Sequence, residues 1–223
     1  MGSFLDRLAK HNYWHGEVIE SGFPRRGYLD KLEEFSGNRL AKVLVGQRRT
    51  GKSYLLKQWI RELIAHGVPA RNVLYMNKEH LDIAELTDQA QLHETIRDYL
   101  ENVAGTGKVY LLLDEIQEVD GWERVVASYA QDGRRECELT ITGSNSHMLS
   151  SELGTYLSGR HIPIPVFPFS FSEFVEAYAV QPDRSGLMTY LRRGGLPELL
   201  NLETDESRRH YVMALRDSVL LND

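Results

Sequence analysis

The chain has 223 residues, of which 42% are hydrophobic and 26% charged, a composition typical of an ordinary globular domain. Its formal net charge of −6 excludes an overall positive field that would attract nucleic acid. The single cysteine, Cys137, excludes an internal disulfide or a zinc cluster of cysteines and favours a cytoplasmic protein. No stretch approaches the ~20 apolar residues needed to span a membrane.

The sequence predicts an N-terminal extension over residues 1–30, an α/β core over 31–166 and a helical lid subdomain over 167–223. In the core, apolar runs alternate with helical patterns, which indicates a mainly parallel sheet with helices on its faces. Prolines in the last of these runs place it at an edge of the sheet. Strands are predicted at 40–46, 72–77, 108–115, 138–144 and 161–166, and helices over 55–67, 84–103 and 122–129.

The pattern changes after residue 166. The segment "FPFSFSEFVEAY" contains a capping box, Ser170 with Glu173 three residues later, which predicts the start of a helix. The rest of the sequence favours helices only, and a helical pattern that includes Tyr211, Leu215 and Val219 runs to the end of the chain. We therefore expect a shortened lid, with a further C-terminal part missing.

The segment 46–53 matches the pattern G-x-x-x-x-G-K-[ST]. A loop that wraps a pyrophosphate turns its N–H groups inward, which glycines permit, and the following helix points its positive dipole end at the phosphates. Lys52 is expected to reach the β- and γ-phosphates, and Ser53 to ligate Mg²⁺. The predicted nucleotide-binding segment is Gly46, Gln47, Arg48, Arg49, Thr50, Gly51, Lys52, Ser53 and Tyr54.

The run "YLLLDEIQEV" predicts a buried strand that ends in two carboxyl groups. Asp114 is expected to hold Mg²⁺ through water. The side chain of Glu115 is expected on the opposite face of the pleat, where a second carboxylate polarises the water that attacks the γ-phosphate. Adjacent acids favour hydrolysis over phosphate transfer to a small molecule. The alternative is a pair of acids that ends a strand at the surface.

The next predicted strand ends at "TITGSNS", which supplies Thr142, Ser144 and Asn145. In a parallel sheet this end lies beside Asp114. Asn145 is the first choice, and Ser144 the second, for a contact with the γ-phosphate or the attacking water. The alternative stays open that these are turn residues that cap a helix at 146–153.

Five segments in this order resemble prokaryotic AAA+-type ATPases of the archaeal-ATPase-like branch, near the STAND NTPases. The resemblance covers roughly residues 25–223 and implies a P-loop NTPase fold with three αβα layers. It also implies an additional strand between the phosphate-loop strand and the Asp114 strand, ATP rather than GTP, and a C-terminal domain of unknown function. The segments are "GQRRTGKS", "LLLDEIQEV", "TGSNSHMLSSEL", "LSGRHIPIPVFPFSFSEF" and "GGLPE".

The resemblance adds two candidate residues. "GGLPE" (194–198) is similar to a lid element of STAND proteins, which implies that Pro197 faces the adenine; the alternative is a helix joint built from two glycines and a proline. Arg160 is by analogy an arginine finger or a γ-phosphate sensor, in cis or in trans, or else it forms a salt bridge at the strand edge. Arg48 and Arg49 either face solvent or contact phosphate or a neighbouring subunit.

The main interpretation is an ATP-binding, Mg²⁺-dependent ATPase, a hydrolase that acts on acid anhydrides. It would work as a nucleotide-driven switch or motor for an unseen domain or protein partner, with the lid transmitting hydrolysis. Two alternatives stay open: a regulatory module that holds nucleotide and hydrolyses it slowly, and a motor stimulated by nucleic acid. A homo-oligomer is also left open, and no membrane partner is expected.

Overall fold

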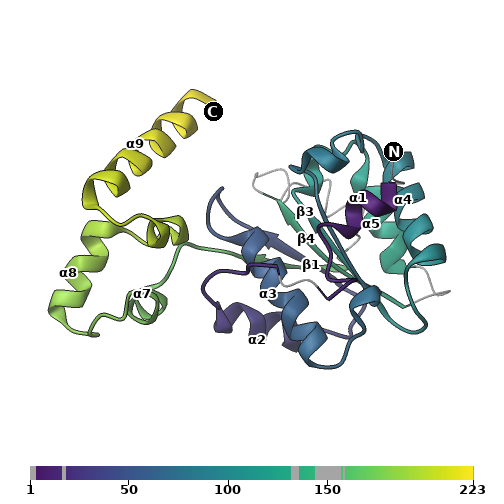
Figure 1. Ribbon diagram of the computed structural model, residues 1–223, viewed down its shortest axis with the longest axis horizontal. Helices are drawn as coiled ribbons and strands as arrows, with labels where there is room; N and C mark the ends of the chain where they lie inside the picture. The colour runs from purple at the N-terminus through teal and green to yellow at the C-terminus, as the bar shows by residue number, and fades with distance from the viewer. Residues whose placement is uncertain (1–3, 17–18, 132–135, 144–156, 158, 223) are drawn as a thin grey trace. The chain divides into compact units, whose positions relative to one another are not determined.

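The computed structural model describes residues 4–16, 19–131, 136–143, 157 and 159–222 (Figure 1). The chain divides into two compact units. The first, called the core unit below, comprises Met1–Arg48 and Lys52–Val166; the second, called the helical unit, comprises Arg49–Gly51 and Phe167–Asp223.

The core unit is built around a five-stranded sheet with the order β2-β3-β4-β1-β5. All neighbouring strands pair in parallel, as predicted. β5 lies at the edge, and β4 separates β1 from β3, as the family resemblance implied. The strands are β1 (Ala41–Val45), β2 (Val73–Asn77), β3 (Val109–Asp114), β4 (Cys137–Gly143) and β5 (His161–Pro165).

Helices cover both faces of this sheet and give the expected three layers (Figure 1). α1, α4 and α5 pack on one face, and α2 and α3 pack on the other. The helices are α1 (Phe4–Ala9), α2 (Arg26–Glu34), α3 (Lys52–Ala65), α4 (Gln89–Asn102) and α5 (Trp122–Gln131), with 3₁₀ turns η1 (Ala70–Asn72), η2 (Leu81–Ile83) and η3 (Ile116–Glu118).

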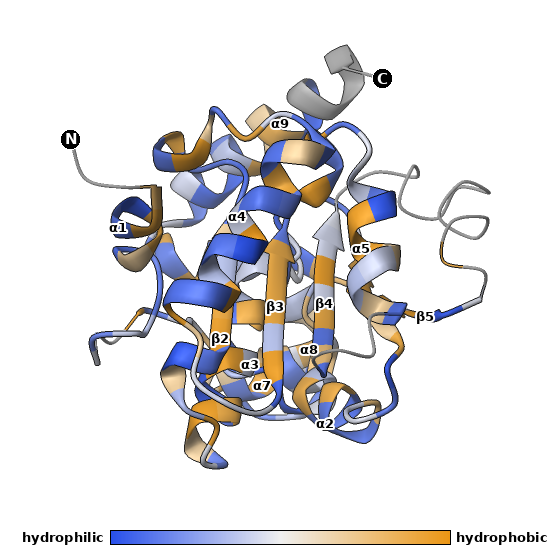
Figure 2. Ribbon diagram, turned by 90° about the vertical axis from the view of Figure 1, so that its right-hand side faces the viewer, coloured by the Kyte–Doolittle hydropathy of each residue, from blue (hydrophilic) through white to orange (hydrophobic). Residues whose placement is uncertain are grey.

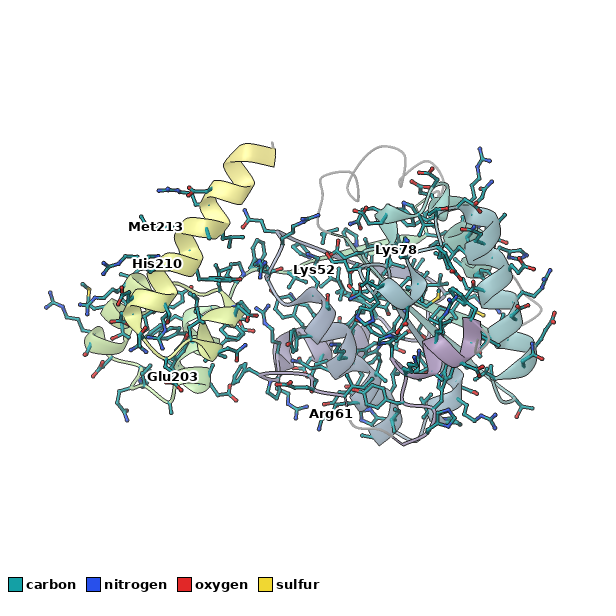
Figure 3. The ribbon with its side chains drawn as sticks, turned by 45° about the horizontal axis from the view of Figure 1, so that its top comes forward. Lys52, Arg61, Lys78, Glu203, His210 and Met213 are labelled. Atoms are coloured by element: carbon teal, nitrogen blue, oxygen red, sulfur yellow. The ribbon has the colours of Figure 1, made fainter. Side chains whose placement is uncertain are left out.

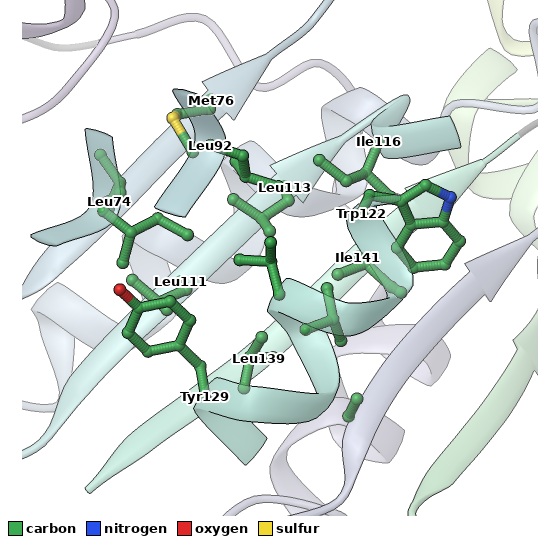
Figure 4. Close-up of a cluster of buried hydrophobic side chains, with 14 of the residues drawn as sticks. Leu74, Met76, Leu92, Leu111, Leu113, Ile116, Trp122, Tyr129, Leu139 and Ile141 are labelled. Atoms are coloured by element: carbon green, nitrogen blue, oxygen red, sulfur yellow. The ribbon is translucent and has the colours of Figure 1, made fainter. Parts of the chain in front are cut away.

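The central strands are apolar because the helices remove both of their faces from water. In Figure 2 these strands are largely orange, whereas α4 shows many polar residues. Each fully buried aliphatic side chain contributes about 1.5–3 kcal/mol. The cluster on the α4/α5 face includes Leu74, Met76, Leu92, Leu111, Leu113, Ile116, Trp122, Tyr129, Leu139 and Ile141 (Figure 4).

Two local predictions need correction. The helix expected over 84–103 begins only at Gln89, because the side chain of Asp88 caps it by accepting hydrogen bonds from the Ala90 and Gln91 amides. The strand expected over 108–115 ends at Asp114. Glu115 has a left-handed backbone conformation with φ 51°, so the alternation of a strand does not decide where its side chain lies.

The helical unit contains α7 (Phe171–Tyr178), α8 (Arg184–Arg193), the 3₁₀ helix η5 (Pro197–Asn201) and α9 (Asp205–Asn222). The predicted capping box is present, because Ser170 accepts from the Glu173 amide while the Glu173 carboxylate accepts from Ser170. Figure 3 labels His210 and Met213 on α9. Among the described residues, no helix combines the length and the apolar composition needed to cross a membrane.

Candidate functional site

The candidate site begins in the loop between β1 and α3. Arg49 has φ 67° and Gly51 has φ 91°, a region that disfavours L side chains. Gly46 does not have a positive φ, so the bend depends on Arg49 and Gly51 rather than on both motif glycines. α3 carries no acidic residue in its first turn, which leaves the positive end of its dipole for an external anion.

Lys52 is the first residue of α3, and its side chain is buried. Its ammonium group donates to the carbonyl oxygens of Gly46 (3.0 Å) and Gln47 (3.1 Å) and lies 3.6 Å from Oε1 of Glu115. Burial lowers the pKa of the Lys52 amino group, while Glu115 and Asp114 act in the opposite direction. The lysine, labelled in Figure 3, is therefore held by the loop carbonyls and lies next to Glu115.

Asp114 ends β3 and is 1% exposed. The hydroxyl of Thr142 donates to its Oδ1 at 2.5 Å. Its Oδ2 accepts from the hydroxyl of Tyr75 at 2.8 Å and from the amide of Asn77 at 3.0 Å. The Ser53 side chain lies close enough to the same carboxyl to lower its pKa. Strands β2 and β4, on either side of β3, thus fix both oxygens of Asp114.

The protonation of this cluster follows from its burial. Burial raises the pKa of the Asp114 carboxyl above its ordinary value of 3.8, although hydrogen bonds from Thr142 and Ser53 act in the opposite direction. Burial and the adjacent Asp114 also raise the pKa of Tyr75 well above its ordinary value. The phenol therefore keeps its proton and serves as a hydrogen-bond donor to the carboxyl.

The oxygen atoms here fit a hard divalent cation. Mg²⁺ prefers carboxylate and hydroxyl oxygens and retains several waters, and the Ser53 hydroxyl lies close enough to the Asp114 carboxyl to lower its pKa. The two groups that the sequence assigns to the metal therefore lie in one place. A cation would also supply the positive charge that a buried carboxyl requires.

Glu115 is buried and directed toward the loop lysine. Its backbone N–H donates to the hydroxyl oxygen of Thr142 at 3.0 Å, so Thr142 contacts both acidic residues. Its Oε2 accepts a 2.6 Å hydrogen bond from the side-chain amide of Gln117. The left-handed conformation of a residue that is not glycine costs about 1 kcal/mol or more, and such strain is common at functional sites.

The remaining predicted site residues lie as follows. Gln47, Arg48 and Arg49 are exposed and Thr50 is buried. The exposed ring of Tyr54 lies against Gly22. The exposed Arg160 directly precedes β5, and its carbonyl accepts from the Ala41 amide. Their predicted contacts with nucleotide stay predictions.

Pro197 belongs to the helical unit, where it begins η5. Local packing accounts for both glycines before it. Gly194 ends α8 with φ 81°, and a Cβ on Gly195 would approach the Phe169 carbonyl oxygen to 2.5 Å. These contacts match the helix-joint alternative, while the contact of Pro197 with adenine stays a prediction. Ser144 and Asn145 lie outside the described residues.

Sequence reasoning missed three residues of this site, namely Tyr75, Asn77 and Gln117. A signal for the first two was present, because polar residues at alternate positions of an otherwise apolar strand share one face. In the register of β2 and β3, Asn77 pairs with Asp114, and this register brings the polar face of β2 into contact with the Asp114 carboxyl. Gln117 had no such signal, because its position depends on the turn that follows β3.

Comparison with known proteins finds relatives whose sequences align with most of the chain. The family model described as "AAA domain" matches residues 38–175. An uncharacterized protein of Haemophilus influenzae is 35% identical over 205 residues, covering 89% of this chain and 50% of that protein. One of Methanocaldococcus jannaschii is 28% identical over 193 residues, covering 82% and 41%. The chain thus spans about half the length of the curated relatives it matches.

Solved structures share the fold. A Walker-type ATPase of Pyrococcus abyssi superimposes with a TM-score of 0.60 at 16% identity, covering 89% of this chain and 73% of that one. The replication initiator DnaA, bound to AMPPCP and single-stranded DNA, gives a TM-score of 0.50 at 16% identity, covering 96% and 72%. The family match extends over more than half of the chain, and the resemblance to AAA+-type proteins seen in the sequence is confirmed: the chain belongs to the AAA domain family and has a P-loop NTPase fold.

Proposed function

We propose that this chain binds ATP with Mg²⁺ and hydrolyses it, and that hydrolysis drives a switch or motor for another domain or a protein partner. One observation carries the proposal: the loop lysine and the two acidic side chains converge at the carboxyl end of the sheet. Lys52 lies 3.6 Å from Glu115, and the Ser53 side chain lies close enough to Asp114 to lower the pKa of its carboxyl. The AMPPCP in the DnaA structure supports an adenine nucleotide as the ligand.

In the proposed reaction the chain's own residues hold the triphosphate and move one proton. Lys52 exchanges its carbonyl partners for phosphate oxygens, and Ser53 and Asp114 would hold the metal. When bound, Mg²⁺ would neutralise charge on the phosphate oxygens. Glu115 accepts a proton from water as the water oxygen bonds to the γ-phosphorus. The bond from that phosphorus to the oxygen shared with the β-phosphate breaks, and its electron pair leaves with ADP.

The output of hydrolysis is proposed to pass through residues 167–223 as a lid. Helices that change orientation with the state of a bound nucleotide are a recurring way to transmit hydrolysis. We keep Pro197 as a candidate contact for the base, Asn145 for the γ-phosphate or water, and Arg160 for transition-state charge. The partner is another part of a longer protein or a separate protein, because the curated relatives are about twice as long as this chain.

Steady-state phosphate release tests the proposal. We expect Glu115→Gln to bind ATP with unchanged affinity and to lose about 10²–10⁴-fold in turnover, the usual contribution of a positioned base. Glu118→Gln serves as the matched control, because Glu118 is an exposed carboxylate three residues away. Turnover that is slow in wild type and unaffected by Glu115→Gln would instead support a regulatory module that holds nucleotide.

A second candidate is a motor stimulated by nucleic acid, favoured by the single-stranded DNA in the DnaA structure. The formal net charge of −6 opposes non-specific attraction to DNA. Phosphate release measured with and without single-stranded DNA, at low and high salt, distinguishes a motor stimulated by nucleic acid from an ATPase that acts on a protein partner. Salt-dependent stimulation of turnover by DNA would favour the motor, and turnover that is indifferent to DNA would favour a protein partner.

A further inference from the structure

Gln117 contacts Glu115, the residue proposed to activate water. The amide of Gln117 lies 2.6 Å from Oε2 of Glu115, while Oε1 of the same carboxyl lies 3.6 Å from the Lys52 ammonium. The carboxyl is thus held at both oxygens, by an amide on one side and by the loop lysine on the other. Gln117 lies in η3, a single 3₁₀ turn that is separated from the end of β3 by Glu115 alone.

The two ends of the Gln117 amide have different surroundings. The end that contacts Glu115 is the N–H end, because an amide oxygen has no proton to donate to a carboxylate. The other end, Oε1, is shielded from solvent and has no hydrogen-bond donor among the residues that the structure describes. A buried acceptor without a donor costs about 1–3 kcal/mol. An unsatisfied group of this kind calls for an explanation such as a catalytic role or a bound water.

A water molecule that reacts at Glu115 has two hydrogens. Glu115 accepts one of them as the base, and the second needs an acceptor that fixes the direction of the oxygen lone pair. The carbonyl of Gln117 belongs to the side chain that already holds Glu115, and it lacks a donor within the described part of the chain. A glutamine that orients the attacking water is an established device in nucleotide hydrolysis.

We propose that Gln117 is the water-positioning residue of this site. Its N–H group orients the Glu115 carboxyl, and its carbonyl oxygen accepts the second hydrogen of the attacking water. The proton balance is that of the proposed reaction: one hydrogen passes to Glu115, and the hydrogen held by Gln117 stays on the oxygen that becomes part of inorganic phosphate. The inference rests on the proposed function and names one more residue for it.

The Glu115 carboxyl also contacts Lys52, which changes partners when a triphosphate binds in the proposed function. Lys52 contacts Glu115 and two loop carbonyls, and it must leave at least some of these partners to reach phosphate. When the ammonium shifts, the Glu115 carboxyl loses its contact on the side opposite Gln117. The hydrogen bond from Gln117 then remains to orient the Glu115 carboxyl while the triphosphate is bound.

The test is Gln117→Met, which keeps the length of the side chain and removes both polar ends. We expect an unchanged affinity for Mg²⁺–AMPPCP by calorimetry and a turnover about 10–100-fold lower, the usual effect of a misplaced reactant. The variant should also lose at least about tenfold in affinity for ADP with aluminium fluoride, which mimics the transition state. Glu118→Gln is the control in all three measurements, because Glu118 lies in the same 3₁₀ turn and is exposed.

A wild-type turnover in both Gln117→Met and Gln117→Asn would overturn the inference. So would a parallel loss of AMPPCP binding and turnover, which indicates a structural role only. Gln117→Asn is included in case the methionine variant does not fold, because it stays polar but withdraws the amide from Glu115. If wild-type protein itself releases no phosphate, the proposed function fails instead, and the two failures are distinguishable.

Discussion

The face of the sheet that packs against α2 and α3 holds a buried charged cluster at each end of its strands. At the amino end, Glu138 contacts Lys42 at 2.7 Å and also Lys108, and it accepts from the Ser36 hydroxyl and the Gly37 amide. Lys108 also lies 3.5 Å from the carboxyl of Glu136, so the amino-end cluster has two ammonium groups for two carboxyls. At the carboxyl end, the described residues place one ammonium group, that of Lys52, beside the carboxyls of Asp114 and Glu115.

This difference separates a structural cluster from a functional one. Burial opposes ionisation of Glu138, but hydrogen bonds from Lys108 and Lys42 outweigh it, and the pKa of Glu138 is lowered. At Asp114 the hydrogen bonds do not outweigh burial, and the pKa is raised. The first carboxyl has its cations supplied by the fold. In the proposed function, Mg²⁺ supplies further positive charge beside the second carboxyl.

The largest expected effect is a loss of stability from a substitution in the cluster at the amino end of the strands. Glu138→Gln leaves the buried Lys42 without its carboxylate and removes one of the two carboxylates at Lys108, and we expect a loss of about 3–5 kcal/mol in the free energy of unfolding. Turnover per folded molecule should stay the same. Glu115→Gln should do the reverse, with stability within about 1 kcal/mol. Urea denaturation and phosphate release on both variants check this, and equal stability losses would remove the distinction.

Acid should weaken the amino-end cluster selectively. The pKa of Glu138 is lowered from its ordinary value of 4.5. A carboxyl whose pKa is lower in the folded state stabilises the fold at pH values above its pKa in the unfolded chain. That stability is lost as the pH falls through the pKa of the folded state. The gap in unfolding free energy between wild type and Glu138→Gln should therefore narrow between about pH 5 and pH 3. A gap that is constant over this range would contradict the assignment.

Thr142 and Thr140 provide a matched pair on β4. Thr142 donates to Asp114 and accepts from the amide of Glu115, whereas Thr140 is buried in the middle of the same strand. We expect Thr142→Val to raise the Mg²⁺ concentration for half-maximal turnover about 10–100-fold, as loss of a group that orients a metal ligand does. Thr140→Val should leave it unchanged. Equal shifts in both variants would mean that only strand packing was changed.

The smallest expected effect is that of Tyr75→Phe. The substitution removes one donor to Oδ2 of Asp114, and Asn77 still donates to the same oxygen. We expect a change of about 0.5–1.5 kcal/mol in unfolding free energy. In turnover we expect less than about a tenfold loss, which corresponds to 1.4 kcal/mol. A loss as large as that of Glu115→Gln would make Tyr75 a principal residue of the site.

The sequence predicts the parts of the carboxyl-end site that depend on neighbours along the chain. Gly51, Lys52 and Ser53 form one continuous motif, and Asp114 ends an apolar run of strand length. The strands themselves follow from apolar runs, because both faces of a parallel sheet are buried. These features need no knowledge of which strands lie side by side.

The rest depends on contacts between distant segments. Lys42 and Glu138 are 96 positions apart, and their meeting depends on β4 lying next to β1. The hydrogen bonds of Tyr75 and Asn77 to Asp114 likewise require the register of β2 and β3. The polar residues Glu138, Thr140 and Thr142 alternate along β4 and thus share one face. This alternation is a signal that can be read from the sequence once the strand is placed.

The most direct test of the central claim is calorimetry of ATP binding in the presence and absence of Mg²⁺. For wild type we expect saturable heat that depends on Mg²⁺. Lys52→Ala should lose that binding, and Lys57→Ala, on the same helix, should retain it. Binding of equal strength in Lys52→Ala, or no heat in folded wild-type protein, would contradict the assignment of this end of the sheet to a nucleotide and its metal.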